Sequence, residues 1–459
     1  MWITKNLLDI YRISSYIFLY YFLGWYLERY FSLNFISYCL IIFILIFTQF
    51  LIIKKKNFLP IFFIFLLLGN LAGQNRHFVV NIWLQNSLDQ FKSNEIGFFL
   101  LKIKWKLEGK DISIFLNRDE LLIPSRNLNN LNSNEKLVFS IDYMPLFIVY
   151  TDENNQLKKK NIIESSSNAG IIYADDQNNF IFYNSQTGNL MQKINFKNEK
   201  AKTIWKLKGD YFFHHWGDFF DNKIYIPGRK YIKTENKKNF INKNCDNKYI
   251  NQDTILIVDF NSGKIVEEIN IFDLILSSEF SKLFYSCINP IHLNDIEIIK
   301  KEDQLQYFEN AKVGDYLISL RNINTILLID HETKEIKWSY NKDLVMQHSP
   351  QITDKGTLLI FNNLGSKVIE GQSRIDEIEI KTKKIVGIFD GVKNNFYSEK
   401  RGRIQFIDGR IFIQESQKSN LFELICEDKF ISDDCKKKNI VTLDQEIKDI
   451  FQSFAIDFF

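Results

Sequence analysis

Hydrophobic and polar positions divide the chain into two unlike parts. In the first part, residues 13–27, 33–53 and 57–75 are mainly apolar stretches without a charged residue. The middle stretch has 21 residues, and as a helix it would span about 31 Å, the thickness of the hydrocarbon core of a membrane. From about residue 145 onward, short β-rich runs alternate with polar turns. The pattern predicts N-terminal transmembrane helices followed by an all-β domain.

Basic residues that flank these stretches predict how the chain crosses the membrane. Lys5 and Arg12 precede the first stretch, and three lysines at 54–56 separate the second from the third. Positively charged segments stay in the cytoplasm. Residues 1–12 are therefore expected to be a cytoplasmic N-terminus, and residues 13–75 a membrane segment of two or three transmembrane helices. The expected location is the inner (cell) membrane, with the C-terminal domain facing the periplasm or the outside.

The first stretch leaves two alternatives open. Residues 13–27 can span the membrane only if Arg12, Glu28 and Arg29 lie at its interfaces, and they can instead be a buried helix of a globular domain. Two spans instead of three leave the C-terminal domain on the same side. A cleaved signal peptide is not expected, because no small-residue cleavage site follows a short apolar core.

A repeated unit organises the part that follows a connector, which we assign to residues 76–144. The clearest copy covers residues 314–340 and has three β-rich runs, YLISL, TILLID and EIKWSY, separated by polar turns. Comparable turns, NSQTGNL, DFNSGKI, DHETKEI and EIKTKKI, begin at residues 184, 259, 330 and 379. A fifth, degenerate unit covers residues 403–425.

Units of this kind, repeating about every 40–50 residues with insertions, are typical of propeller blades. Residues 145–459 number 315 and fit six blades. We therefore predict an all-β, six-bladed β-propeller preceded by N-terminal transmembrane helices. A β-sandwich or barrel is the alternative.

Charge and cysteine content change this picture little. The chain has 58 Lys+Arg and 55 Asp+Glu, for a net charge of +3, so no nucleic-acid partner is expected. The lysine runs at 158–160 and 436–438 are interpreted as solvated loops. An exported domain permits disulfides, and we predict Cys426–Cys435, which closes a short loop, and Cys245–Cys287.

Histidine is rare and therefore easy to follow. The six are His77, His214, His215, His292, His331 and His348. Three segments open with histidine before a turn and a strand, so His215 (or His214), His292 and His348 take comparable positions in successive units. First strands of blades line the central channel, and these side chains can converge there. The alternatives are structural histidines that bond turn backbones, or a three-histidine zinc site. His331 is placed in an outer, solvated turn.

The segments around these histidines resemble the bacterial arylsulfotransferase family. The family pattern has an H-x-N motif, an S-x-R strand leading to an acidic turn and a Trp, and a Q-H motif before a G-x-(I/L)-L-(I/L)-F-(D/N)-N strand. The matching residues are His292 with Asn294, Ser319 with Arg321 and Trp338, and Gln347 with His348. The resemblance covers residues 210–415 well and residues 145–210 loosely.

This resemblance implies a six-bladed propeller with a funnel-like active site. Such enzymes transfer a sulfuryl group from an aryl sulfate to a phenol without a nucleotide donor, so the implied partners are small-molecule aryl sulfates and phenols, with no cofactor and no metal. The resemblance implies that His348 is the nucleophile that becomes sulfated, and that His292 and Arg321 stabilise the sulfuryl oxygens and the leaving phenolate. Further substrate contacts are assigned to His214, His215 and Asn294.

Two other functions fit parts of the sequence. A non-catalytic propeller can bind a ligand or act as a scaffold, although a scaffold has no use for several aligned histidines over a channel. A quinoprotein-like dehydrogenase is suggested by the turn-plus-Trp unit DHETKEIKW at residues 330–338, but no other unit is expected to carry Trp at that place.

Overall fold

The computed structural model describes the C-terminal part of the chain. It covers residues 136–141, 146–151, 157–163, 169–174, 179–184, 190–197, 200–233, 249–286, 288–364, 372–416, 420–442 and 454–458. All of them belong to one compact unit, Asp89–Phe459. Among these residues no helix is long and apolar enough to cross a membrane. The spans predicted within residues 13–75 lie outside the described residues.

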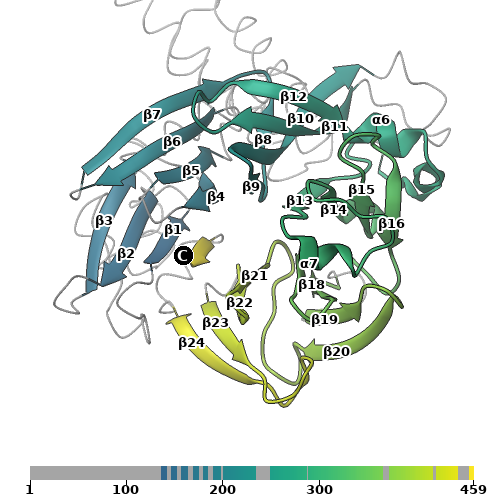
Figure 1. Ribbon diagram of the computed structural model, residues 1–459. Helices are drawn as coiled ribbons and strands as arrows, with labels where there is room; N and C mark the ends of the chain where they lie inside the picture. Colours follow the sequence, from purple (N-terminus) through teal and green to yellow (C-terminus); the bar gives the residue numbers. More distant parts are fainter. Residues whose placement is uncertain are drawn as a thin grey trace, which may run out of the picture. The chain divides into compact units, whose positions relative to one another are not determined.

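The described strands form six antiparallel sheets, numbered here in chain order and arranged around a common centre (Figure 1). Sheet 1 has the order β25-β1-β2-β3, with bounds Phe454–Phe458, Lys136–Ile141, Leu146–Thr151 and Leu157–Ile163. Sheet 2 has the order β4-β5-β6-β7, with bounds Ala169–Ala174, Asn179–Asn184, Leu190–Lys197 and Lys200–Lys208. Sheet 3 has the order β12-β11-β10-β8, and β9 also pairs with β10; in chain order from β8 the bounds are Phe212–Phe213, Asp218–Phe220, Lys223–Lys233, Tyr249–Asp259 and Ile265–Asn270.

Sheets 4, 5 and 6 each have four strands in sequence order. Sheet 4 contains β13 to β16, with bounds Leu293–Ile298, Tyr316–Leu320, Thr325–Ile329 and Ile336–Tyr340. Sheet 5 contains β17 to β20, with bounds His348–Ile352, Thr357–Asn362, Arg374–Glu379 and Lys384–Asp390. Sheet 6 contains β21 to β24, with bounds Arg403–Ile407, Arg410–Glu415, Asn420–Ile425 and Lys436–Thr442. The protein is therefore an all-β propeller, as the alternating runs predicted, and the sandwich alternative is wrong.

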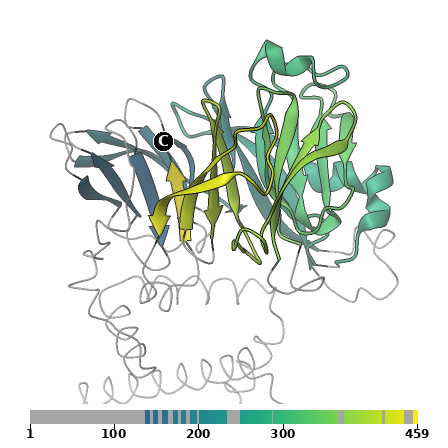
Figure 2. The same cartoon turned by 90° about the horizontal axis from the view of Figure 1, so that it is seen from below.

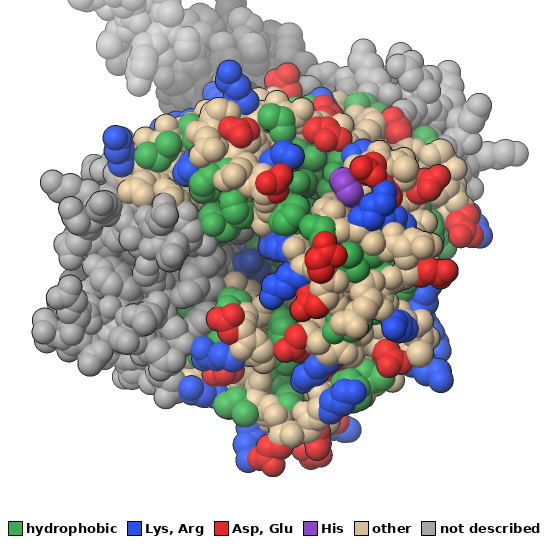
Figure 3. All heavy atoms as spheres, in the orientation of Figure 1, with side chains coloured by type: hydrophobic (Ala, Val, Ile, Leu, Met, Phe, Trp, Pro, Cys, Tyr) green, Lys and Arg blue, Asp and Glu red, His purple; other side chains and the backbone are tan. Residues whose placement is uncertain are grey.

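Short helices connect some of the strands. The α-helices are α6 (Ile271–Leu276) and α7 (Glu302–Leu305), and the 3₁₀ helices are η4 (Glu279–Leu283) and η5 (Arg321–Ile323). Seen from the side, many of the strands stand roughly upright, while others, such as the long yellow strand near the C-terminus, cross the view obliquely (Figure 2). On the face in view in Figure 3, acidic and basic side chains are interspersed without a broad patch of one sign.

The hydrophobic core of the described residues lies between neighbouring sheets, in clusters shared by sheets 2 and 3, 3 and 4, 4 and 5, and 5 and 6. Every residue of β14 and of β15 is buried. Leu317 and Ile318 are adjacent in β14, yet Ile318 packs in the cluster shared with sheet 3 and Leu317 in the cluster shared with sheet 5. Alternate side chains of one strand thus serve two interfaces. This explains why these strands read as continuous apolar runs in the sequence.

Two tryptophans connect neighbouring sheets in the same way. Nε1 of Trp205 on β7 donates to the carbonyl oxygen of Phe260 at 2.9 Å, and Nε1 of Trp338 on β16 donates to that of Ile380 at 3.1 Å. Each acceptor directly follows the third strand of the next sheet. The expectation that Trp338 has no counterpart is therefore wrong. The repeat turn assigned at residue 184 follows β5, one strand too early, which hid the equivalence of Trp205.

The first and last sheets of the propeller correct three expectations from the sequence. β1 already pairs with β25 (Leu137↔Phe458), so the propeller includes residues 136–141, which the predicted connector had covered. The unit at 403–425 is not degenerate, because β24 completes its sheet. The lysine runs at 158–160 and 436–438 lie in β3 and β24, the outer strands of sheets 1 and 6, and are not loops. Charged side chains are common on such edges because they discourage further strand pairing.

A disulfide joins the last two strands of sheet 6. Cys426 follows β23, Cys435 precedes β24, and the two are bonded, as predicted. The other predicted pair, Cys245–Cys287, lies outside the described residues.

We expect replacement of Cys435 by serine to lower the thermal midpoint by about 5 °C, because a short cross-link contributes on the order of 2–3 kcal/mol. Differential scanning calorimetry of this variant and of the wild type with and without reductant measures the shift; an unchanged midpoint after reduction would contradict it.

Candidate active site

Three inner strands bring the histidines to the centre of the propeller. His214 and His215 lie between β8 and β9, His292 directly precedes β13, and His348 is the first residue of β17. These strands are the first strands of sheets 3, 4 and 5. The predicted register of the histidines in successive units therefore matches their placement in the fold.

The backbone around these side chains is bent in unusual ways. His215 and His292 have φ values of 58° and 55°, and Met346 and Ser349, on either side of His348, have values of 55° and 50°. The pairing of β13 shifts register just after Leu293, and that of β17 shifts just after His348. Left-handed residues and bulges of this kind concentrate at functional sites, where they redirect side chains.

The four imidazole rings form one cluster with His215 at its centre. The ring centroid of His215 lies 5.1 Å from that of His214, 5.0 Å from that of His292 and 5.8 Å from that of His348. The centroids of His214 and His292 are 6.0 Å apart. The sequence left open whether His214 or His215 faces the others, and in the structure His215 contacts all three.

Hydrogen bonds fix the tautomer of His348. Its Nδ1 lies 2.9 Å from the carbonyl oxygen of Met346 and 2.7 Å from Oδ1 of Asn363. The Asn363 amide is itself oriented, because Nδ2 donates to the carbonyl oxygens of Ser398 and Arg401 at 2.7 Å each. Both partners of Nδ1 are acceptors, so Nδ1 carries the proton. The lone pair of neutral His348 is therefore on Nε2.

His215 and His292 share one proton. Their Nε2 atoms are 2.8 Å apart, so one must donate and the other accept. As the amide of Asn289 is placed, its Nδ2 lies 2.5 Å from Nδ1 of His292 and donates to it. The proton of neutral His292 is then on Nε2 and points into the cluster.

The positive charge of Arg321 lies on the His348 side of the cluster. Arg321 begins η5, its Nη2 contacts Sδ of Met346 at 3.3 Å, and its Nη1 donates to Oδ1 of Asn322 at 2.9 Å. Its backbone N–H donates to the carbonyl oxygen of His292 at 3.0 Å. Arg321 is thus fixed between the loops that carry the two histidines.

Burial and positive charge keep all four histidines neutral. Burial, followed by the charge of Arg321, lowers the pKa of His348 to about 3. Burial, followed by the charge of Arg229, lowers the pKa of His214 to about 4 and that of His292 well below its usual range. Burial also lowers the pKa of His215 well below that range. At neutral pH the cluster therefore offers lone pairs and N–H donors without charge of its own.

Two motif residues join strands and do not line the cluster. Asn294 is buried, and its Nδ2 donates to the backbone oxygen of Gln347 at 2.8 Å. The side chain of Gln347 donates to Oγ of Ser319 at 3.1 Å and to the carbonyl oxygens of Leu320 and Thr325. The H-x-N, S-x-R and Q-H motifs thus hold β13, β14 and β15 of sheet 4 to the residue that precedes His348 and β17 of sheet 5.

Sequence reasoning missed an ion pair behind His214. Arg229 on β10 and Asp253 on β11 are direct cross-strand partners, and Nε of Arg229 lies 2.9 Å from Oδ1 of Asp253. The same oxygen lies 3.4 Å from Nε2 of His214, and Oδ2 accepts the N–H of Leu293 at 3.3 Å. No local pattern in the sequence indicates this pair, because it depends on the register of β10 against β11, two strands separated by residues 234–248.

A cavity of about 290 Å³ is lined by Trp216, which follows His215 in the chain, and by Ser349, which follows His348. Its lining also includes Asp295 and Arg403. Burial raises the pKa of Asp295 to about 8, so at neutral pH this carboxyl is mainly protonated. At neutral pH Asp295 therefore adds little negative charge to the cavity, whose lining also includes Asp218, Glu297, Asp303 and Asp354.

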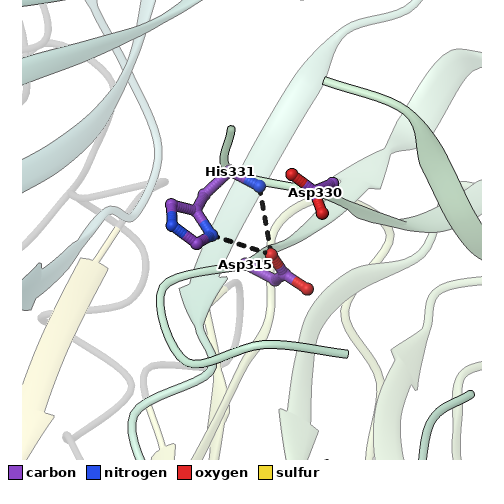
Figure 4. A group of neighbouring side chains, drawn as sticks. All are labelled: Asp315, Asp330 and His331. Atoms are coloured by element: carbon purple, nitrogen blue, oxygen red, sulfur yellow. Dashed lines mark hydrogen bonds and ion pairs between the residues drawn. The ribbon is translucent and has the colours of Figure 1, made fainter. Parts of the chain in front are cut away.

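A different group of side chains has the composition of a metal site. Within the described part of the chain, Asp315, Asp330 and His331 are the only such group whose ligand atoms all lie within 4.8 Å of one another (Figure 4). Nζ of Lys337 already contacts both carboxylates at 2.7 Å, and Nδ1 of His331 lies 3.0 Å from Asp315. A lysine cation occupies the place of a metal, so the group is best explained as an ion-pair network of the blade turn.

Comparison with known proteins agrees with the fold and the motifs. The protein is a β-propeller with a cluster of four histidines, and an arginine beside them, at the centre of the ring. The profile of the family described as Arylsulfotransferase (ASST) matches residues 167–434, more than half of the chain. The protein therefore belongs to the arylsulfotransferase family, as its motifs predicted. A search of curated proteins gives no match.

Three solved structures illustrate distant likenesses of the fold. A protein of unknown function from Bacteroides caccae is 11% identical, with 70% of this chain and 98% of that chain covered and a TM-score of 0.43. Apo AztD from Citrobacter koseri is 10% identical, with 71% and 98% covered and a TM-score of 0.36. Sqt1 from Saccharomyces cerevisiae is 8% identical, with 65% and 79% covered and a TM-score of 0.39. No functional argument rests on these likenesses.

Proposed function

We propose that this protein is an arylsulfotransferase that moves a sulfuryl group from an aryl sulfate to a phenolic acceptor through a sulfohistidine at His348. The observation that carries the proposal is the hydrogen bonding of Nδ1, which leaves the Nε2 lone pair available at neutral pH. A covalent intermediate divides one difficult transfer into two easier steps. The six sheets support a six-bladed propeller as its scaffold.

In the first step, Nε2 of His348 attacks sulfur and forms an N–S bond. The bond between sulfur and the aryl oxygen breaks, and its electron pair leaves with the phenolate. Positive charge develops on the imidazole ring, where the oxygens of Met346 and Asn363 stabilise it through Nδ1–H. The guanidinium fork of Arg321 suits the sulfuryl oxygens.

His292 serves as the proton donor and acceptor of the cycle. An anionic aryl sulfate opposes the charges of Arg229 and Arg321 and so raises the pKa of His292 in the complex. Protonated His292 gives its proton to the departing phenolate. In the second step, the acceptor phenol returns a proton to His292, its oxygen attacks sulfur, and the N–S electron pair goes back to Nε2 of His348.

A chromogenic aryl sulfate tests the proposal. Incubation of the full chain in detergent with this donor and a phenol should release the coloured phenol and give a sulfated acceptor of the mass expected. Rapid quenching with donor alone should leave a sulfohistidine in the peptide that contains His348. Binding of the donor without phenol release would instead favour the non-catalytic, ligand-binding alternative.

The membrane anchor is part of the proposal. The uncharged stretches within residues 13–75 and the lysines at 54–56 support an anchored protein whose propeller faces the periplasm or the outside. We expect an alkaline phosphatase fused after about residue 90 to be active, since this reporter folds only when exported. Activity of a cytoplasmic reporter alone at the same position would contradict this topology.

A further inference from the structure

Buried polar atoms without partners gather on the side of the cluster away from His348. Nη2 of Arg229 and both ring nitrogens of His214 are buried, and none of these three atoms has a hydrogen-bond partner within the described part of the chain. The 3.4 Å contact from His214 to Asp253 lacks hydrogen-bond geometry. Unpaired buried polar atoms cost free energy, and they commonly mark the place of a bound water or ion.

The guanidinium group of Arg229 is paired through Nε, whereas its Nη2 has no hydrogen-bond partner among the described residues. Its side chain is 14% exposed, and its Nε is paired with the fully buried carboxylate of Asp253. Asp253 also receives the N–H of Leu293, the residue after His292. The ion pair therefore fixes Arg229 against the loop that carries His292, while Nη2 keeps its donors for another acceptor.

We propose that Arg229, positioned by Asp253, is a second arginine of the active site and binds the anionic sulfate group of the substrate from the His214 side of the cluster. Arg321 approaches from the His348 side, through its contact with Met346. The inference rests on the proposed function and deepens it by placing the sulfate group between two arginines. The charges of both arginines lower the pKa of His292, consistent with a position between them.

Binding of inorganic sulfate tests this directly and does not require turnover. Titration calorimetry on the full chain should give a dissociation constant that rises about 10- to 100-fold in Arg229→Gln, the range for loss of a hydrogen bond to a charged group. Arg229→Lys keeps the charge but loses the fork, and should fall between. Arg410→Gln is the matched control, because Nε of Arg410 also pairs with a carboxylate on the neighbouring strand, Glu423 at 2.7 Å, but in sheet 6.

A purely structural role for Arg229 predicts different readouts. If Arg229 binds the anion, KM for an aryl sulfate rises in Arg229→Gln, whereas the pKa of His292 and of His214 rises in either case, because the charge of Arg229 lowers both in the free protein. Folded Arg229→Gln or Arg229→Lys with wild-type sulfate affinity would overturn the inference, as would a wild type that binds no sulfate. Arg229-dependent sulfate binding without phenol release would leave the inference standing and defeat the proposed transferase. Sulfuryl transfer by the wild type, together with unchanged sulfate binding in Arg229→Gln, would support the proposed transferase and overturn the inference about Arg229.

Discussion

Replacement of His348 by alanine or asparagine should reduce sulfuryl transfer to below about a thousandth of the wild-type rate, since no other group takes over a covalent nucleophile. His348 is only 1% exposed, so alanine also leaves a small void in the core. Asparagine fills more of this space and can still donate to Asn363, which makes it the better test of chemistry apart from folding. Phenol release from donor alone, measured by stopped flow, gives the rate.

His331→Ala is the control for this experiment. His331 lies in the outer turn of sheet 4 beside Asp315 and Lys337, so its removal should leave transfer unchanged. The pH dependence adds a second check. Because the pKa of His348 is lowered to about 3, its imidazole stays neutral as the pH falls from 8 to 5, and the rate should not decline over this range through protonation of His348. Wild-type donor cleavage by His348→Asn, or label on another residue, would rule out this nucleophile.

Replacement of His292 by alanine should lower kcat/KM by about 10²–10⁴-fold for donors whose phenols are poor leaving groups, because such donors need a proton in the transition state. Donors with acidic phenols leave as stable phenolates and should lose much less. The measurement is a plot of log kcat/KM against the leaving-group pKa for a series of substituted phenyl sulfates. The plot should be steeper in the variant than in the wild type.

The shape of this plot separates two roles of His292. His292→Gln keeps an N–H donor but cannot deliver a proton, so it should restore part of the binding without restoring the shallow slope. A uniform loss across all donors would mean that His292 contributes to binding or to the arrangement of the loop through Asn289. In that case the leaving phenolate takes its proton from elsewhere, and the proposed role of His292 is wrong.

Repeated strands and rare histidines made the main features predictable. Alternating runs and turns gave the propeller, and four histidines in a chain with only six could be placed in register. The turn at residue 184 was assigned one strand early, because NSQTG resembles the later NSG turn although it follows β5. The strand at 436–442 was missed since three lysines look like a loop, while an outer edge strand tolerates them.

Contacts that depend on three-dimensional pairing were beyond the sequence. Arg229 and Asp253 meet only through the register of β10 and β11, which no local pattern reports. The tautomer of His348 depends on Asn363, 15 positions later and fixed by backbone atoms of a third segment. Asn294 was assigned to the site by resemblance and Gln347 was identified only as a motif residue, and the buried partners of both became visible only in the fold.

Pairing of β25 with β1 has a consequence for how the protein is made. The paired residues Val138 and Asp457 are more than 300 positions apart, so sheet 1 lacks a strand until nearly the whole propeller has been synthesised. Contacts of such long range form slowly, because a large loop must close first. The nascent chain therefore holds an open ring in which sheet 1 lacks β25 and β1 has an unpaired edge. Ring closure is expected to be the late step of folding, and the stage at which chaperones and proteases compete for the chain.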